Sequence, residues 1–201
     1  MDIFILAMFV AIGVNIVRAK YQRRRIALLG SHLGNYQIEK LMVSLTDGYM
    51  RALGEPDPQR REQIWNLLAT TEAGLCDQLN RFAAGFAKVE EAEARVSKFA
   101  LTIPYADKFF PDATFDVRKA LAIHAQGIAD SAKNSSNRSA KDKAFTLCAE
   151  LFLLQHTCHW FCKSKTVASA RMLARHKTSY EQLIASVASD TRKAYCRLTQ
   201  R

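Results

Sequence analysis

Hydrophobic residues are concentrated at the start of the chain, where residues 3–17 contain no charged side chain and Asn15 is the only strongly polar one. A helix over these fifteen residues would be about 22 Å long, which is short for a hydrocarbon core of about 30 Å. Basic residues follow at once, and long basic side chains at a helix end can reach back to the headgroups. The pattern predicts a membrane helix that either spans the bilayer or lies in its interface.

Two other interpretations of this segment are open. A cleaved signal peptide has positive charge before its apolar run and a small-residue cleavage site after it, whereas here Asp2 comes before the run and a basic cluster after it. A helix in a protein core can be as long, but it usually carries a polar stripe, and residues 3–17 have almost none. We therefore favour the membrane helix. The side chains expected to face lipid are Ile3, Phe4, Leu6, Phe9 and Val10.

The basic cluster after the run predicts its orientation. The residues expected at the headgroups are Arg18, Lys20, Arg23, Arg24 and Arg25. Because positive charge stays on the cytoplasmic side of a membrane, we expect a single-pass protein with its N-terminus outside and its body in the cytoplasm. The cluster would also attract anionic lipid headgroups, by about 1 kcal/mol for each basic residue near the surface. A topology signal alone explains the cluster, so lipid selectivity does not follow from it.

Beyond residue 35 the apolar positions recur every three or four residues, as in amphipathic helices. A first break in the helical pattern is predicted at residues 30–34. It divides the chain into a membrane anchor (1–25), a hinge (26–35) and one α-helical domain (36–201). The expected helices cover 36–54, 58–86, 88–98, 114–128, 140–162 and 179–198, with a short basic helix around Met172. The range 88–98 is rich in charge, which is typical of a solvated helix.

Residues 100–111 do not fit the helical period. Two prolines bracket an aromatic group made up of Tyr105, Phe109 and Phe110. Exposed aromatic residues in a loop can form a binding surface, although they more often pack beneath the fold as a small satellite cluster. Both interpretations stay open from the sequence.

The fold class follows from the helices and their short connections. Strand signals are scarce, and the 201 residues leave one domain's worth of chain after the anchor. Short loops favour antiparallel neighbours. We therefore expect an all-α protein in which an N-terminal membrane helix is followed by a single antiparallel helical bundle. Residues 140–162 should form its central helix, since Glu150 is the only charged residue from Ala144 to Cys162.

The net charge of +10 is carried by the two ends of the chain. Residues 1–25 hold +4 and residues 163–201 hold +7, so the middle is close to neutral, at −1. Clustered positive charge suits nucleic acid or another acidic partner, although no recognised nucleic-acid motif is present. The basic residues expected to form a partner surface on the last helix are Arg192, Lys193, Arg197 and Arg201.

Five cysteines are present, an odd number with no secreted spacing pattern, and we expect free thiols in the core. The one constellation that could bind zinc is Cys148, Cys158, His159 and Cys162, because helical spacing brings some of them onto one face. No Cys-x₂-Cys motif supports the site, so these residues are weak candidates. Further ligands would have to come from Cys76, Cys196, His124 or His176.

No catalytic motif appears in the sequence, and an enzyme is not the favoured class. The function expected is a membrane-anchored cytoplasmic helical protein that binds other proteins, as an assembly, scaffold or regulatory component, without a cofactor. The first alternative is a basic helical protein that binds nucleic acid or an acidic partner. The second is a thiol- or metal-dependent protein that uses the Cys/His-rich helix.

Overall fold

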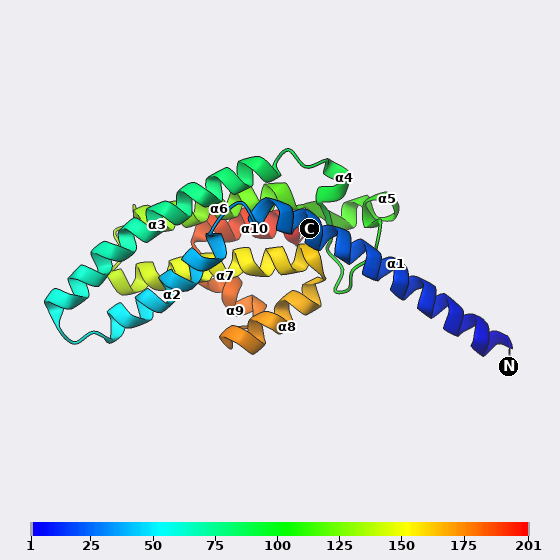
Figure 1. Ribbon diagram of the computed structural model, residues 1–201, viewed down its shortest axis with the longest axis horizontal. Helices are drawn as coiled ribbons and strands as arrows, with labels where there is room; N and C mark the ends of the chain where they lie inside the picture. The colour runs from blue at the N-terminus through cyan, green and yellow to red at the C-terminus, as the bar shows by residue number, and fades with distance from the viewer. Residues whose placement is uncertain (1, 201) are drawn as a thin grey trace.

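A long helix leads out of a bundle of shorter ones (Figure 1). The structure, a computed structural model, describes residues 2–200. Within that range it contains ten α-helices and one two-stranded sheet, which confirms the all-α class. The long helices are α1 (Asp2–Leu33), α2 (Ile38–Gly54), α3 (Pro58–Phe86), α6 (Val117–Lys133) and α7 (Ala140–Cys162). The shorter elements are α4 (Glu91–Ala94), β1 (Arg95–Ser97), α5 (Ala106–Phe109), β2 (Thr114–Asp116), α8 (Lys165–His176), α9 (Tyr180–Ser186) and α10 (Ser189–Thr199).

Helix α7 lies at the centre of the bundle, as the scarcity of charge from Ala144 to Cys162 predicts. It packs against α1, α2, α6, α8 and α9, while α2 and α3 form a hairpin that α7 and α6 support (Figure 1). Apolar side chains over most of α7 are buried, from Leu147 to Phe161. Burying a large apolar side chain contributes about 1.5–3 kcal/mol, so this helix is the main organiser of the core.

Capping residues fix where the long helices begin. Asp57 accepts hydrogen bonds from the backbone N–H groups of Gln59 and Arg60, and Pro58 occupies the first helical turn of α3. Ser139 caps α7 in the same way. At α9 the reciprocal capping box joins Ser179 and Gln182. The predicted starts of the helices at 58 and 140 are confirmed.

Two predicted helices are interrupted in the structure. Residues 88–98 form one helical turn, α4, followed by strand β1, which pairs antiparallel with β2 in the register Val96↔Phe115. The prediction of a solvated helix there is wrong because Val96 is drawn into the core, where 1% of it is exposed. The last helix is divided into α9 and α10, since the Ala188 N–H leaves the helical pattern and donates to Glu150 of α7.

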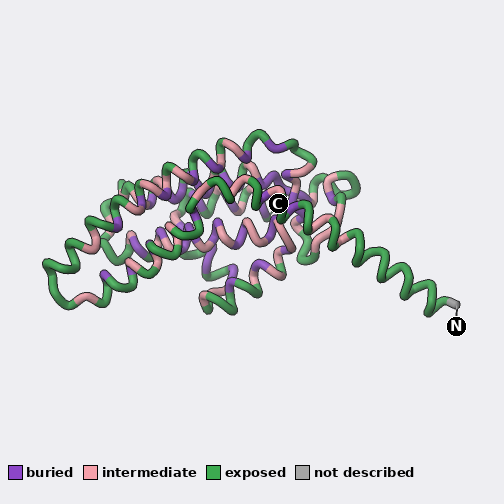
Figure 2. Tube along the Cα trace, in the orientation of Figure 1, coloured by how far each residue is buried: buried purple, intermediate pink, exposed green. Residues whose placement is uncertain are grey.

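Helix α1 has two parts with different surroundings. From Tyr21 to Leu33, a segment we call the root, it packs on the bundle, whereas residues 3–17 project alone, and this projecting half is exposed along its length (Figures 1 and 2). The helix continues through Gly30, so most of the expected hinge at 26–35 is helical and the turn comes after Leu33. Within residues 2–200, Ile3–Leu33 is the one helix long and apolar enough to cross a membrane, and none of its apolar window is buried.

Candidate functional site at the root of the first helix

Arg25 joins the root of α1 to the bundle. Its guanidinium donates hydrogen bonds to the carbonyl oxygens of Phe161, at 3.2 Å, and of Arg95. The same group lies over two aromatic rings, 4.4 Å from the centroid of Tyr21 and 4.8 Å from that of Phe161. Carbonyl acceptors and ring faces are the partners that stabilise a buried cation in the absence of a carboxylate.

The prediction that Arg25 lies at the lipid headgroups is therefore wrong. Only 5% of this residue is exposed, and its planar group with several N–H donors is used to link α1 with the C-terminal end of α7 and with β1. In a run of five basic residues between 18 and 25, composition alone does not separate this residue from its exposed neighbours. Spacing gives a signal, because Tyr21, Arg25 and Leu29 recur every four residues on one helical face.

Other contacts hold the root in place on both sides of Arg25 along the helix. Leu29 is buried in the main core, and the ring of His32 lies edge-on to Phe86, with 5.0 Å between the centroids. Lys163, just after α7, donates to the side-chain oxygen of Gln22 at 3.1 Å. These contacts fix the direction in which residues 3–17 leave the bundle.

Four basic residues remain at the surface where the apolar segment joins the root, and we call them the basic flank: Arg18, Lys20, Arg23 and Arg24. Arg24 forms an ion pair with Glu93, but 76% of its side chain is exposed, and an exposed pair contributes at most about 1 kcal/mol. The flank is therefore available to phosphate groups. Lipid contact by these residues, and by Ile3, Phe4, Leu6, Phe9 and Val10, stays a prediction; all five apolar side chains are exposed.

The Cys/His candidates on α7 do not form a metal centre. Within the part of the chain that the structure describes, no group of three or more His, Cys, Asp or Glu side chains is arranged to hold a metal ion. Burial raises the pKa of Cys158 to about 12, and those of Cys148 and Cys162 to about 11, so these thiols stay protonated at neutral pH. Burial also lowers the pKa of His159. All five cysteines are free, as expected.

The further ligands considered from sequence have other partners. His124 is fully buried, and its Nε2 lies 2.9 Å from the hydroxyl of Thr157, so it is a core histidine with one hydrogen bond. His176 stacks on Phe152, with 3.9 Å between the ring centroids. Each ring is thus held by the packing around it.

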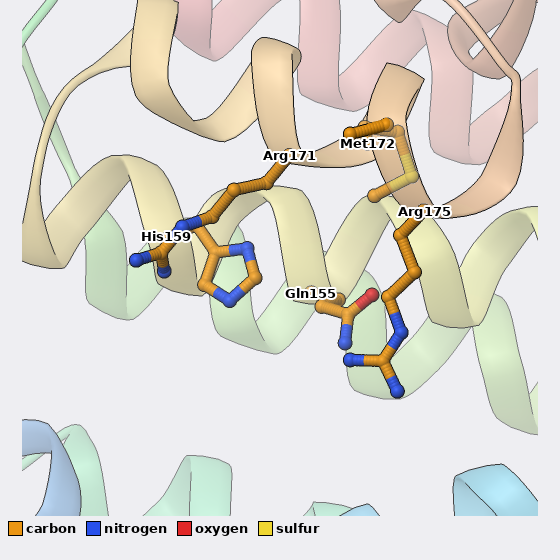
Figure 3. A pocket seen from close by; sticks show the side chains of 6 residues that line it. Gln155, His159, Arg171, Met172 and Arg175 are labelled. Atoms are coloured by element: carbon orange, nitrogen blue, oxygen red, sulfur yellow. The ribbon is translucent and has the colours of Figure 1, made fainter.

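A basic pocket lies between α7 and α8, where sequence reasoning identified no site. It has a volume of about 420 Å³ and is lined by Gln155, His159, Arg171, Met172 and Arg175, with Ala174. The two arginines extend from α8 past the α7 side chains (Figure 3). Their i, i+4 spacing is visible in the sequence, but the α7 half of the pocket is assembled only by folding. Such a pocket suits an acidic group, and nothing in the described residues identifies one.

The predicted basic surface on the last helix is partly described. Arg192, Lys193 and Arg197 are exposed on α10, while Arg201 lies outside the described residues. Their role in binding a partner stays a prediction. Comparisons of this chain with models of protein families, with curated proteins and with solved structures give no match.

Proposed function

We propose that this chain is a membrane-anchored α-helical interaction protein. The first half of α1 inserts in the bilayer, and the bundle is held at the cytoplasmic surface, where it binds other proteins. One observation carries the proposal: residues 3–17 form a helix whose side chains have no contact with the core, and none of the apolar window is buried. This segment is therefore not part of the hydrophobic core of the bundle.

The exposed apolar area is too large to be stable in water. Eleven large apolar side chains between Ile3 and Val17 are exposed. At about 1.5 kcal/mol or more for each buried side chain, their removal from water would contribute on the order of 15 kcal/mol. Hydrocarbon provides that burial along the entire circumference of a lone helix.

The continuity of α1 supports insertion across the full apolar thickness. The helix from residue 2 to residue 20 is about 28 Å long, close to the hydrocarbon thickness of about 30 Å. The basic flank then lies at one headgroup layer. By the positive-inside rule that layer is the cytoplasmic one, so the N-terminus is outside.

Exposed apolar side chains at the far end of the bundle support an interaction role. Val43 and Met50 on α2 and Leu67 on α3 are exposed, Met50 and Leu67 to 70% each. They belong to the α2–α3 hairpin, which extends away from the N-terminal half of α1 (Figure 1). Apolar surface of this kind is typical of sites that meet another protein.

Alkaline extraction of membranes tests the anchor. The full chain is expected in the membrane pellet after carbonate treatment, and a chain lacking residues 2–17 in the supernatant, because only the former places its apolar helix in hydrocarbon. Protease added to the outside of intact cells should leave the bundle uncut and should cut it after the cells are opened. A full chain that is extracted in folded form, or a bundle digested from outside, would contradict the anchor or its orientation, respectively.

The interaction role is tested on the same preparation. The detergent-solubilised chain should be found in a particle whose protein mass is larger than that of one copy. This mass is measured by light scattering, with the detergent contribution subtracted. A monomer recovered under conditions that keep other membrane complexes intact would oppose this part of the proposal.

A further inference from the structure

The loop between β1 and β2 exposes a group of large apolar side chains. We call residues 98–113 the aromatic loop. Phe109 is 70% exposed and Leu101 56% exposed, and the other large apolar residues exposed in the loop are Phe99, Tyr105 and Phe110. The sequence leaves open whether these residues pack beneath the fold or face outward, and the structure places them outward. Soluble surfaces rarely carry such a group without a partner.

The aromatic loop is held in this shape by the fold. The Lys98 N–H donates to the carbonyl of Ala113 at 2.8 Å, next to the β1–β2 ladder. Both the backbone N–H and the hydroxyl of Thr166 donate to the carbonyl of Ala100. These bonds tie the ends of the loop to the sheet and to α8, so the exposed side chains stay where the backbone presents them.

A ring contact and a backbone angle inside the loop define how its aromatic side chains are presented. The rings of Phe99 and Phe110 pack edge to face, with 5.7 Å between centroids. Tyr105 has a left-handed backbone with φ of 58°, which is unusual for a bulky residue and persists only where the surrounding structure requires it. The loop therefore has a defined outward-facing apolar surface.

The aromatic loop lies beside α1 at the level of the basic flank. The ring of Tyr105 packs against Tyr21, with 5.7 Å between centroids. Tyr21 comes four residues after Val17, the last residue of the apolar segment, which is about 6 Å along the helix axis. Figure 1 shows α5, within the loop, next to the stretch of α1 where the helix leaves the bundle. If residues 3–17 are in hydrocarbon, the loop is at the headgroup layer.

The side chains of the loop are of the types found at the headgroup layer of a membrane. Aromatic residues are enriched at membrane–water interfaces, where their rings lie at headgroup level. The ammonium of Lys108 lies 5.7 Å from the Tyr105 ring centroid, and the acidic residues Asp107 and Asp112 balance Lys98 and Lys108, so the loop has no net charge. Apolar contact, rather than charge, would therefore determine how the loop binds, while the adjacent basic flank supplies the attraction to phosphate.

We propose that the aromatic loop is a second membrane contact, seated in the interface of the bilayer that α1 enters. This inference rests on the proposed anchor. The continuity between the apolar segment, the basic flank and the loop identifies lipid as the occupant of the exposed surface. With two contacts at different positions, the bundle is held in one orientation to the membrane instead of swinging about α1.

Tryptophan quenching by brominated lipid tests the inference. Full-length chains carrying Phe109→Trp, Phe9→Trp or Phe145→Trp are reconstituted separately in vesicles of phosphatidylcholine and phosphatidylglycerol, with or without bromine on the acyl chains. The emission of the unsubstituted chain, which has two tryptophans, is subtracted. Phe145 is the matched control because it is an exposed phenylalanine on α7, sixteen residues before Phe161 and so about 24 Å along the helix from the root.

The expected result is a blue shift and bromine-dependent loss of emission for F109W and F9W, and neither for F145W. Loss for F109W should be greatest with bromine near the headgroup, and loss for F9W with bromine deeper in the chain. Quenching of F9W without quenching of F109W would overturn the loop contact and leave the anchor intact. Absence of quenching for F9W would overturn the anchor and the loop contact together. Equal quenching of F109W and F145W would also overturn the inference, since the loop would then be no closer to lipid than the far end of α7.

Discussion

Replacing Arg25 by alanine is expected to lower the free energy of unfolding of the bundle by about 3 kcal/mol. The change leaves the carbonyl oxygens of Phe161 and Arg95 without their buried donor, at roughly 1–3 kcal/mol for each unsatisfied group. It also removes the cation from the faces of Tyr21 and Phe161. The loss is measured by chemical denaturation in mild detergent, followed through the fluorescence of the buried Trp160.

Arg24→Ala is the matched control, because Arg24 is the next residue and its pair with Glu93 is exposed. It should change the free energy of unfolding by less than about 1 kcal/mol. Arg25→Lys should recover little of the loss, since an ammonium cannot donate to two carbonyls and stack on two rings as a planar guanidinium does. Equal effects of the changes at 24 and 25 would show that Arg25 does not join α1 to the bundle.

Glu150 is expected to make the bundle less stable as pH rises. Its side chain is fully buried in α7 and accepts a hydrogen bond of 3.0 Å from the Ala188 N–H. Burial raises the pKa of this carboxyl from 4.5 to about 7, against the lowering effect of hydrogen bonds from Thr191 and Ala188. The surroundings are tight, because a Cβ added at Gly127 would lie 2.9 Å from Oε2 of Glu150 and 2.2 Å from Oγ1 of Thr191.

The direction in which stability changes with pH follows from proton linkage. Because its pKa is higher in the folded chain than in the unfolded one, the folded chain binds the proton more tightly, so the contribution of Glu150 is fully present below pH 4.5 and is lost as pH rises through about 7. The slope is at most about 1.4 kcal/mol for each pH unit, or about 3 kcal/mol over the window. Glu150→Gln should remove this dependence and be the more stable protein above pH 7.

The measurement is the difference in free energy of unfolding between native and Glu150→Gln chains from pH 4 to pH 8. The difference is needed because burial lowers the pKa values of His124 and His156 to about 3, which makes stability fall as pH drops below about 6.5, the opposite direction. Their contributions are the same in both chains and cancel. An identical pH dependence in the two chains would mean that the pKa of Glu150 is the same in the folded chain as in the unfolded one, which would contradict the prediction.

Local signals were sufficient to predict most long helices. Asp57 with Pro58, and Ser139 with Asp142, mark the starts of α3 and α7 because capping depends on residues within one turn. The lack of charge around Glu150 placed α7 at the centre. Strand β1 could not be found in this way, since it depends on pairing with β2, nineteen residues further along the chain, and tertiary contact there overrides a helical charge pattern.

The candidate site was predictable only in part. The exposed apolar segment and the basic flank follow from residues 3–17 and their neighbours, because both are properties of consecutive residues. The role of Arg25 was missed, since its acceptors belong to Phe161 and Arg95, far away in the sequence. The outward orientation of the loop around Phe109 likewise depends on anchoring by Thr166, which no local pattern reveals.

Photolabelling from within the bilayer tests most directly whether residues 3–17 lie in hydrocarbon. A lipid-soluble carbene precursor is activated in membranes that contain the full chain, and the labelled peptides are identified by mass spectrometry. We predict that the label is concentrated on residues 3–17 and absent from the α2–α3 hairpin. A chain labelled no more on residues 3–17 than on that hairpin, with its first helix instead covered by protein, would contradict the account.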